Sequence, residues 1–180
     1  SLHLAFYLAS WGMYRGSSFL LQKDYKVLSP VVEEVLKPEY DCLFGVACAD
    51  LREPEVQVML TKLYDYIADY FRPIRDEVAG CEVASSVSPV LVTKILMGTL
   101  GCVPAYDRFF QDGVATHKVT TQEYSLKSVL RLVDFYEEHN DRLEETRRGM
   151  QCEDLTYPQM KVLDMGFWQV GFEKDAGSAK

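Results

Sequence analysis

The chain has 180 residues, a net charge of −8, 48% hydrophobic residues and 12% aromatic residues. This length is typical of one domain with a proper core, and the aromatic content excludes a disordered chain. The acidic charge disfavours broad nucleic-acid binding, because contacts to phosphates need a basic surface, although a local basic patch would still permit it.

The opening segment, residues 2–15, is expected to form the first helix. Its apolar residues lie on all sides, which is typical of a helix at the centre of a bundle. Gly12 and Gly16 indicate either close packing or the end of the helix. The segment lacks the basic start of a signal peptide, and no uncharged run in the chain reaches the length of a membrane span.

Trp11, Tyr14 and Arg15 stand close together at the end of this segment. Aromatic rings beside an arginine can line a polar pocket or stack on a base, so these three are candidate binding residues. A structural role is the alternative: Arg15 would then complement the negative end of the helix dipole, with Gly16 as the residue that ends the helix.

Prolines mark the expected starts of the later helices, because proline is favoured at the first helical position, where its missing N–H costs nothing. The stretch 42–49 is the only strand candidate, and it has no partner strand. The sequence therefore predicts an all-α fold, with residues 1–180 forming one compact domain around a buried central helix. The prolines at expected helix starts are Pro30, Pro54, Pro89, Pro104 and Pro158.

A charged run, EEHNDRLEETRR, occupies residues 137–148. Glu144 and Arg148 have the spacing of a favourable pair on one helix face. We interpret the run as a solvated helix end, and a recognition surface is the less favoured alternative.

The five cysteines are odd in number, and no two have the spacing of a zinc-binding C-x2-C pair. We interpret them as buried free thiols of a protein in a reducing, cytoplasmic compartment. The three histidines are widely separated, and the chain contains no phosphate-binding loop or hydrolase motif, so neither a metal nor a cofactor is expected. The cysteines are Cys42, Cys48, Cys81, Cys102 and Cys152.

Lys94 is the single charge in the long neutral segment 88–106, which we expect to contain the buried central helix. Its side chain would either extend to the surface or be buried, and a buried lysine becomes a nucleophile, a base or the partner of a carboxylate. Asp107 is the nearest candidate partner, although it could instead cap the next helix. A buried pair of this kind is costly and more typical of a site than of a scaffold. Tyr106 and Arg108 flank Asp107 and are further candidate binding residues.

Two resemblances to known families follow from these segments. Residues 4–27, 93–110 and 157–172 together resemble a widespread group of uncharacterised bacterial all-helical proteins, and this likeness covers nearly the whole chain. It implies family membership without an assigned activity.

The segment TKILMGTLGCVPAYDRFF, residues 93–110, is also similar to part of the helix-hairpin-helix base-excision DNA glycosylases. The resemblance implies that Thr93 begins a helix, that Pro104 forms the turn and that Asp107 is the catalytic aspartate. It covers about a tenth of the chain. The glycine-containing phosphate-binding turn of that family and its iron–sulfur cysteines are missing here.

Two functional hypotheses result. The first is a helical module that binds a ligand or partner without a recognised reaction. The second is a base-excision-like enzyme, or a degenerate relative, with Lys94 as nucleophile or phosphate contact and Asp107 as its activating group. A deep pocket that holds both residues would favour the second, as would a rim of arginines around one cleft. The expected rim consists of Arg15, Arg72, Arg75 and Arg108.

Overall fold

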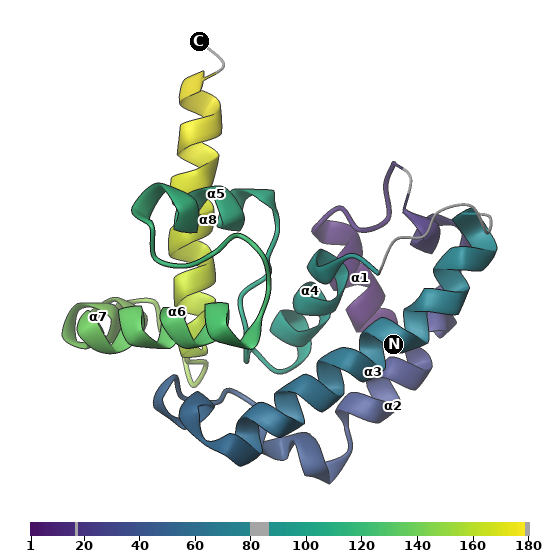
Figure 1. Cartoon of the computed structure of the whole chain (residues 1–180), viewed down its shortest axis with the longest axis horizontal. Coiled ribbons are helices and arrows are strands. Elements are labelled where there is room, and N and C mark those ends of the chain that lie inside the picture. The colour runs from purple at the N-terminus through teal and green to yellow at the C-terminus, as the bar shows by residue number, and fades with distance from the viewer. Residues whose placement is uncertain (17, 80–86, 179–180) are drawn as a thin grey trace.

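The computed structural model of the chain describes residues 1–16, 18–79 and 87–178, and within them it confirms the all-α fold (Figure 1). Short 3-10 helices, labelled η, join several of the α-helices. The α-helices are α1 (Leu2–Ser10), α2 (Ser29–Val35), α3 (Pro54–Ala79), α4 (Pro89–Thr99), α5 (Arg108–His117), α6 (Leu126–Glu138), α7 (Asn140–Gly149) and α8 (Gln159–Ser178). The 3-10 helices are η1 (Phe19–Gln22), η2 (Tyr25–Leu28), η3 (Pro38–Leu43) and η4 (Ala49–Arg52).

The helices lie in two groups. In Figure 1, α1, α2, α3 and α4 lie on one side, with α4 at the inner edge of this group, and α5, α6, α7 and the long α8 lie on the other. The buried apolar side chains of both groups belong to one contiguous cluster that runs from Leu4 to Phe167. The strand considered at 42–49 is wrong: this stretch contains the end of η3, a turn through Gly45 and the start of η4.

Helix α4 is the buried central helix that the sequence predicted. Its residues from Leu91 to Met97 are all buried, and it packs against both α1 and α3. Gly98 allows this packing, because a Cβ atom there would lie 2.3 Å from the ring of Tyr7 on α1. The centre of the fold is therefore apolar on almost every side, which makes a charged residue within it conspicuous.

Helix α1 is shorter and less central than expected. It ends at Ser10 rather than Arg15, and the chain then turns through Gly12 and Gly16, whose φ angles are +73° and +62°. Glycine adopts this left-handed conformation without the steric cost that other residues meet. Phe6 is 66% exposed, so one face of the helix lies on the surface and the prediction of a helix buried on all sides is wrong.

Four of the five expected prolines lie at or next to the start of an α-helix, but Pro104 does not. Helix α5 begins at Arg108, because the backbone before it is held by tertiary contacts. The N–H of Ala105 donates to Oδ1 of Asp164 at 2.9 Å, and the N–H of Tyr106 donates to Oγ1 of Thr93 at 3.1 Å. These bonds hold residues 105 and 106 outside the helix, whose N-cap is Asp107.

Helices α5 and α8 pack against each other through two glycines. A Cβ atom on Gly113 would lie 1.9 Å from the carbonyl oxygen of Phe167, and one on Gly171 would lie 1.9 Å from that of Phe109. No side chain fits between the two backbones at these points, so each glycine is required by the other helix. The pairing fixes α8 relative to the start of α5.

The charged run 137–148 spans the end of α6 and most of α7, and α7 has no buried residue. This confirms a solvated helix. The expected partner of Glu144 is wrong, however: its carboxylate pairs with Arg147, whereas Arg148 donates to its backbone carbonyl. Glu144 also accepts hydrogen bonds from Tyr136 on α6 and Gln159 on α8, at 2.8 Å and 2.6 Å.

Cys48 and Cys102 are buried free thiols, as expected, but Cys42 and Cys152 are exposed, and Cys81 lies outside the described residues. The described part of the chain contains no cluster of metal-binding side chains. None of its helices is long and apolar enough to cross a membrane.

Candidate functional site

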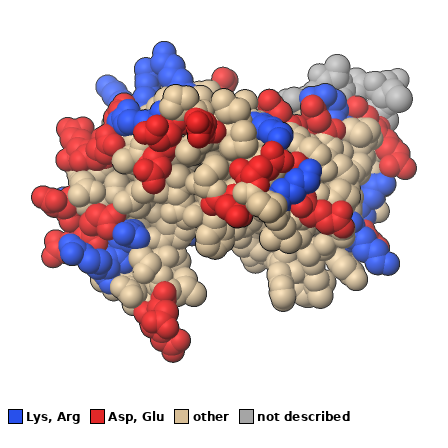
Figure 2. Space-filling view, turned by 90° about the horizontal axis from the view of Figure 1, so that it is seen from below, with Lys and Arg blue, Asp and Glu red and all other residues tan. Residues whose placement is uncertain are grey.

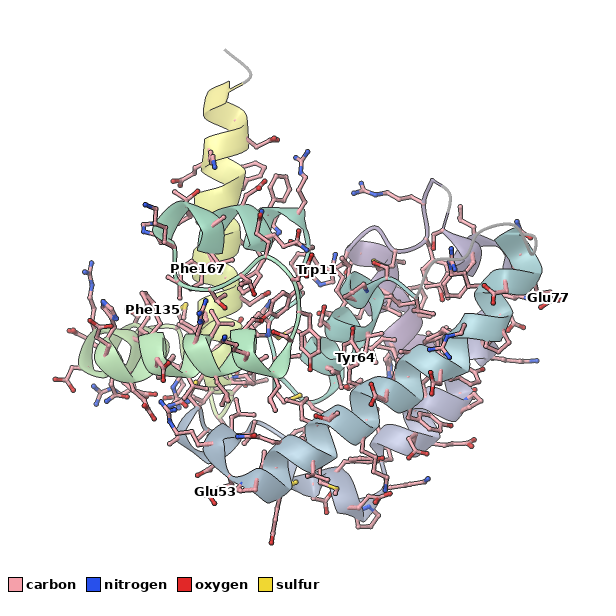
Figure 3. The ribbon with its side chains drawn as sticks, viewed as in Figure 1. Trp11, Glu53, Tyr64, Glu77, Phe135 and Phe167 are labelled. Carbon is pink, nitrogen blue, oxygen red and sulfur yellow. The ribbon has the colours of Figure 1, made fainter. Side chains whose placement is uncertain are left out.

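A cleft of about 860 Å³ opens between the turn after α1, the start of α4 and the α5–α8 pair. Trp11 lies in this region, as Figure 3 shows, between α4 and the start of α5. The lining combines large aromatic rings with charged groups of both signs. The residues that line the cleft are Ala9, Ser10, Trp11, Gly12, Met13, Tyr14, Arg15, Val90, Lys94, Asp107, Arg108, Phe109 and Trp168.

Lys94 lies at the base of the cleft. Its side chain is 6% exposed, and its ammonium donates to the backbone carbonyl of Trp11 at 3.1 Å. Nζ also lies 3.3 Å from Oδ2 of Asp107. An ammonium has three N–H donors, so one remains without a protein acceptor among the described residues. The buried Lys94–Asp107 pair considered from the sequence is therefore present, and it is directed toward a cleft.

Asp107 has two tasks, one for each oxygen. Oδ1 accepts the N–H of Phe110 at 3.2 Å and so caps α5, while Oδ2 faces Lys94. A carboxylate at a helix N-terminus is also stabilised by the helix dipole. The capping role considered from the sequence is confirmed, but it occupies only one of the two oxygens.

The ring of Trp11 lies beside two ammonium groups. Nζ of Lys94 is 5.5 Å from the ring centroid and Nζ of Lys161 is 5.2 Å from it. Lys161 in turn pairs with Asp164 at 2.8 Å, and this aspartate holds the N–H of Ala105. Two lysine–aspartate pairs thus flank one indole ring. Such cation–π contacts fix the position of the ring as well as of the charges.

The buried charges also affect their neighbours. Burial raises the pKa of Asp164, although the ammonium of Lys161 opposes this shift. Burial likewise raises the pKa of Tyr7, whose ring lies against Trp11, and the charges of Asp164 and Asp107 add to the effect. Tyr7 therefore stays neutral behind Trp11.

The two arginines at the rim differ in what holds them. Arg108 pairs with Asp175 on α8 at 2.9 Å, and its guanidinium lies 4.6 Å from the ring centroid of Phe109. Arg15 is exposed and makes no ion pair with any described residue, so its guanidinium is open to an anion. Tyr14 lines the same side, but its hydroxyl is buried without a hydrogen-bond partner in the described structure.

Aromatic rings continue from the cleft onto α8. The ring of Trp168 lies 6.5 Å from that of Trp11 and 5.1 Å from that of Phe109, in edge-on contacts. Trp168 also stacks on Phe172 at 5.2 Å, and Phe172 is 44% exposed. The wall of the cleft is therefore a connected set of rings, which suits a flat ligand.

The structure brings together six of the seven candidate residues from the sequence. Trp11, Tyr14, Arg15, Lys94, Asp107 and Arg108 all line the cleft. Tyr106 does not: its side chain points into the core, where it is fully buried and its hydroxyl bonds that of Ser128. The N–H of Tyr106 donates to Oγ1 of Thr93, so its backbone is held against the buried helix α4.

Other details of the expected site also differ. Thr93 does not begin a helix but lies inside α4, which starts at Pro89. Only Arg15 and Arg108 of the expected arginine rim line the cleft. Arg72 pairs with Asp69 on the surface of α3, and Arg75 is not among the lining residues.

The sequence reasoning missed the contribution of α8, namely Lys161, Asp164 and Trp168. A signal was available for Asp164: it stands in the largely apolar run MKVLDMGFW, in which Lys161 is the only other charged residue. A buried charge in such a run needs a partner, which Lys161 of the same helix provides here. The same test that selected Lys94 would have selected Asp164.

Comparisons of the chain with protein families, with curated proteins and with solved structures found no match. Functional inference therefore depends on the geometry of the cleft.

Proposed function

We propose that the cleft binds a small, flat, negatively charged ligand with the chemistry of a nucleotide. The observation that carries the proposal is the composition of the lining: the rings of Trp11, Phe109 and Trp168 stand beside the cations of Arg15 and Lys94. Aromatic faces hold planar rings by stacking, and an arginine that no carboxylate engages is suited to a phosphate. The protein would then act as a ligand-binding module, for which we keep the proposal of a reducing, cytoplasmic setting.

Intrinsic fluorescence tests this proposal directly, because both tryptophans of the chain, Trp11 and Trp168, line the cleft. Titration with AMP and with dTMP should quench or shift the emission with a saturating curve. Adenosine, which keeps the ring but lacks the phosphate, should bind more weakly. A flat response to all three compounds, repeated by calorimetry, would refute the proposal.

A matched pair of arginine variants locates the phosphate. Arg15→Gln should weaken AMP binding by about tenfold, the effect of one charge-assisted hydrogen-bonding group. Arg72→Gln removes the same charge from the surface of α3, away from the cleft, and should leave the affinity unchanged. Equal losses in both variants would indicate attraction by overall charge instead of binding at Arg15.

A second candidate function is base-excision chemistry in the same cleft. The specific observation in its favour is the buried Lys94–Asp107 pair at the cleft base, together with the resemblance of residues 93–110 to the helix-hairpin-helix glycosylases. A pocket that holds both residues was the criterion for this hypothesis. The incomplete arginine rim disfavours this candidate, because two arginines offer fewer contacts to a nucleic-acid backbone than the four expected.

The chemistry would proceed in one displacement. Asp107 accepts a proton from the Lys94 ammonium, and the neutral amine attacks C1′ of the bound nucleoside. The C1′–N bond to the base breaks, a C1′–N bond to Lys94 forms, and the departing base takes up a proton. Loss of the ring oxygen from C1′ then gives an imine that a hydride donor can reduce.

Borohydride trapping tests this candidate. The protein should be incubated with short single- and double-stranded DNA, with and without a damaged base, across a series of salt concentrations. A covalent adduct that forms with wild-type protein and disappears in Lys94→Met would support the reaction, and base release lost in Asp107→Asn would assign the aspartate. No DNA binding at low salt would exclude the candidate while leaving the nucleotide-binding proposal intact.

A further inference from the structure

A second concave surface lies on the opposite part of the molecule from the cleft, between η3 and the first turns of α3. This groove, called here the η3–α3 groove, has a volume of about 470 Å³. Its floor is almost entirely apolar, and none of its residues takes part in the cleft. It is lined by Glu39, Cys42, Pro54, Glu55, Val56, Val58 and Met59.

The groove exposes apolar side chains that the fold does not use. Val58 is 57% exposed although it stands in the first turns of a helix whose other face is in the core. Phe44, two residues after Cys42, is 74% exposed, although it does not line the groove. Single exposed apolar residues are ordinary, but apolar residues that gather in a concave surface are typical of interaction sites.

The segment that forms the groove is acidic, although Lys37 and Lys62 lie just beyond its ends. Between Pro38 and Met59 the sequence has five acidic residues and one basic residue. That basic residue, Arg52, is already paired with Asp134 and Glu137 on α6. Figure 2 views the molecule from the side on which η3 and the start of α3 lie, and acidic side chains, with basic ones beside some of them, stand there among wide uncharged areas.

The two acidic residues at the groove itself differ in their partners. Glu39 pairs with Lys62 at 2.5 Å, whereas Glu55 makes no ion pair with any described residue. Glu55 therefore offers an uncompensated carboxylate at the edge of an apolar floor. An occupant that places apolar side chains on the floor and cations at the edge would match both properties.

We propose that the η3–α3 groove docks a basic amphipathic segment of a protein partner, with its apolar side chains on Val58 and Met59 and its lysines or arginines toward Glu55. The charge pattern selects this occupant over a second copy of the same chain, because the chain carries a net charge of −8 and two such acidic surfaces repel each other. The proposal is independent of the cleft and of the function proposed for it.

Protection of cysteine provides a readout with an internal control. Cys42 lines the groove, and Cys152 is exposed elsewhere. The probe is a short synthetic peptide of leucine and lysine at helical spacing, added to the 180-residue chain before alkylation with iodoacetamide. Mass spectrometry should show that the peptide slows alkylation of Cys42 severalfold and leaves Cys152 unchanged. Equal protection of both cysteines, or of neither, would overturn the proposal.

Variants separate the apolar and the acidic contribution. Val58→Ser should weaken peptide binding by about tenfold, measured by fluorescence anisotropy. Leu155→Ser is the matched control, since Leu155 is 67% exposed but does not line the groove. Glu55→Gln should weaken binding about threefold at low salt, and Glu145→Gln on α7 should have no effect.

Two further outcomes would overturn the proposal. If a peptide with glutamate in place of lysine binds equally well, the acidic edge has no role. If sedimentation shows that the protein forms dimers that Val58→Ser dissociates, the groove belongs to a second copy of the chain. The first measurement changes only the peptide, and the second uses a variant at the exposed position 58, so folding is expected to be unaffected.

Discussion

Two clusters of charged side chains in this protein contrast in how completely their hydrogen bonds are satisfied: a half-buried one around Glu144 and one at the base of the cleft. Around Glu144, both carboxylate oxygens accept hydrogen bonds from Arg147, and one of them also accepts from Tyr136 and Gln159. At the base of the cleft, the Lys94 ammonium has two acceptors for three donors, and its distance to Asp107 is a longer 3.3 Å.

The contrast separates a structural network from a candidate site. A fully satisfied network rigidifies the elements that it joins, which for Glu144 are α6, α7 and α8. An incompletely satisfied charge that borders a cleft retains the capacity to bind a further group. Four predictions follow from the difference between the two clusters, and their expected effects on stability decrease from the first to the last.

Removal of the Glu144 carboxylate should be the most damaging change. Glu144→Ala leaves Arg147, Tyr136 and Gln159 without their shared acceptor, and we expect a loss of about 3–4 kcal/mol in the free energy of unfolding. Urea denaturation measures it. Glu145→Ala, at the exposed neighbouring position, should cost less than about 0.5 kcal/mol, and a similar cost for both would contradict the network interpretation.

Protonation of Glu144 at acidic pH should disrupt the same hydrogen-bond network. Burial alone would raise the pKa of Glu144, but hydrogen bonds from Arg147, Gln159 and Tyr136 outweigh it and lower the pKa to about 2. The carboxylate thus stabilises the fold above its ordinary pKa of 4.5, and this contribution disappears as the pH falls from there toward 2.

The expected loss over this interval is about 2–3 kcal/mol, measured by urea denaturation at a series of pH values. Other carboxylates titrate in the same range, so the control is Glu144→Gln. Its stability should fall less steeply with acid than that of the wild type. Parallel curves would show that Glu144 is not the group responsible.

The Lys94–Asp107 pair should matter less for stability and more for binding. Lys94→Met should cost about 1–2 kcal/mol, below the 3–5 kcal/mol typical of a broken dry pair, because the cleft admits water to Asp107. The same variant should weaken AMP binding by at least about tenfold. A large loss of stability with unchanged affinity would make Lys94 part of the scaffold.

Substitution of Arg15 should affect ligand binding and leave the stability of the fold almost unchanged. It is exposed and makes no ion pair with the described residues, so Arg15→Gln should change the free energy of unfolding by less than about 0.5 kcal/mol. Its effect should be confined to ligand affinity. Thermal unfolding with and without AMP distinguishes the two, since only the shift produced by the ligand should shrink.

The sequence predicted those parts of the fold and site that depend on local rules. Lys94 stands out because α4 is otherwise neutral, and Asp107 follows it across a single connection. Helix starts at Pro54 and Pro89 follow from the missing proline N–H. These features need only periodicity, capping chemistry and short separations along the chain.

The remainder depends on contacts between distant segments. Asp164 lies 59 residues after Ala105, yet its hydrogen bond helps to keep the helix from starting at Pro104. Gln159 approaches Glu144 only because α7 and α8 are packed together. The charged run 137–148, which the sequence pattern predicts to be solvated, therefore contains the central residue of a hydrogen-bond network. Periodicity assigns residues to faces of a helix but does not say which helices meet.

The glycine contacts between α5 and α8 have a mechanical consequence for the cleft. Because the backbones of these two helices are in contact at Gly113 and Gly171, the helices are expected to move as one rigid unit. This unit carries the cleft residues Asp107, Arg108, Phe109 and Trp168. The opposite wall is a short turn flanked by two left-handed glycines. A ligand too wide for the cleft would therefore be accommodated by displacement of that turn, while the α5–α8 pair stays in place.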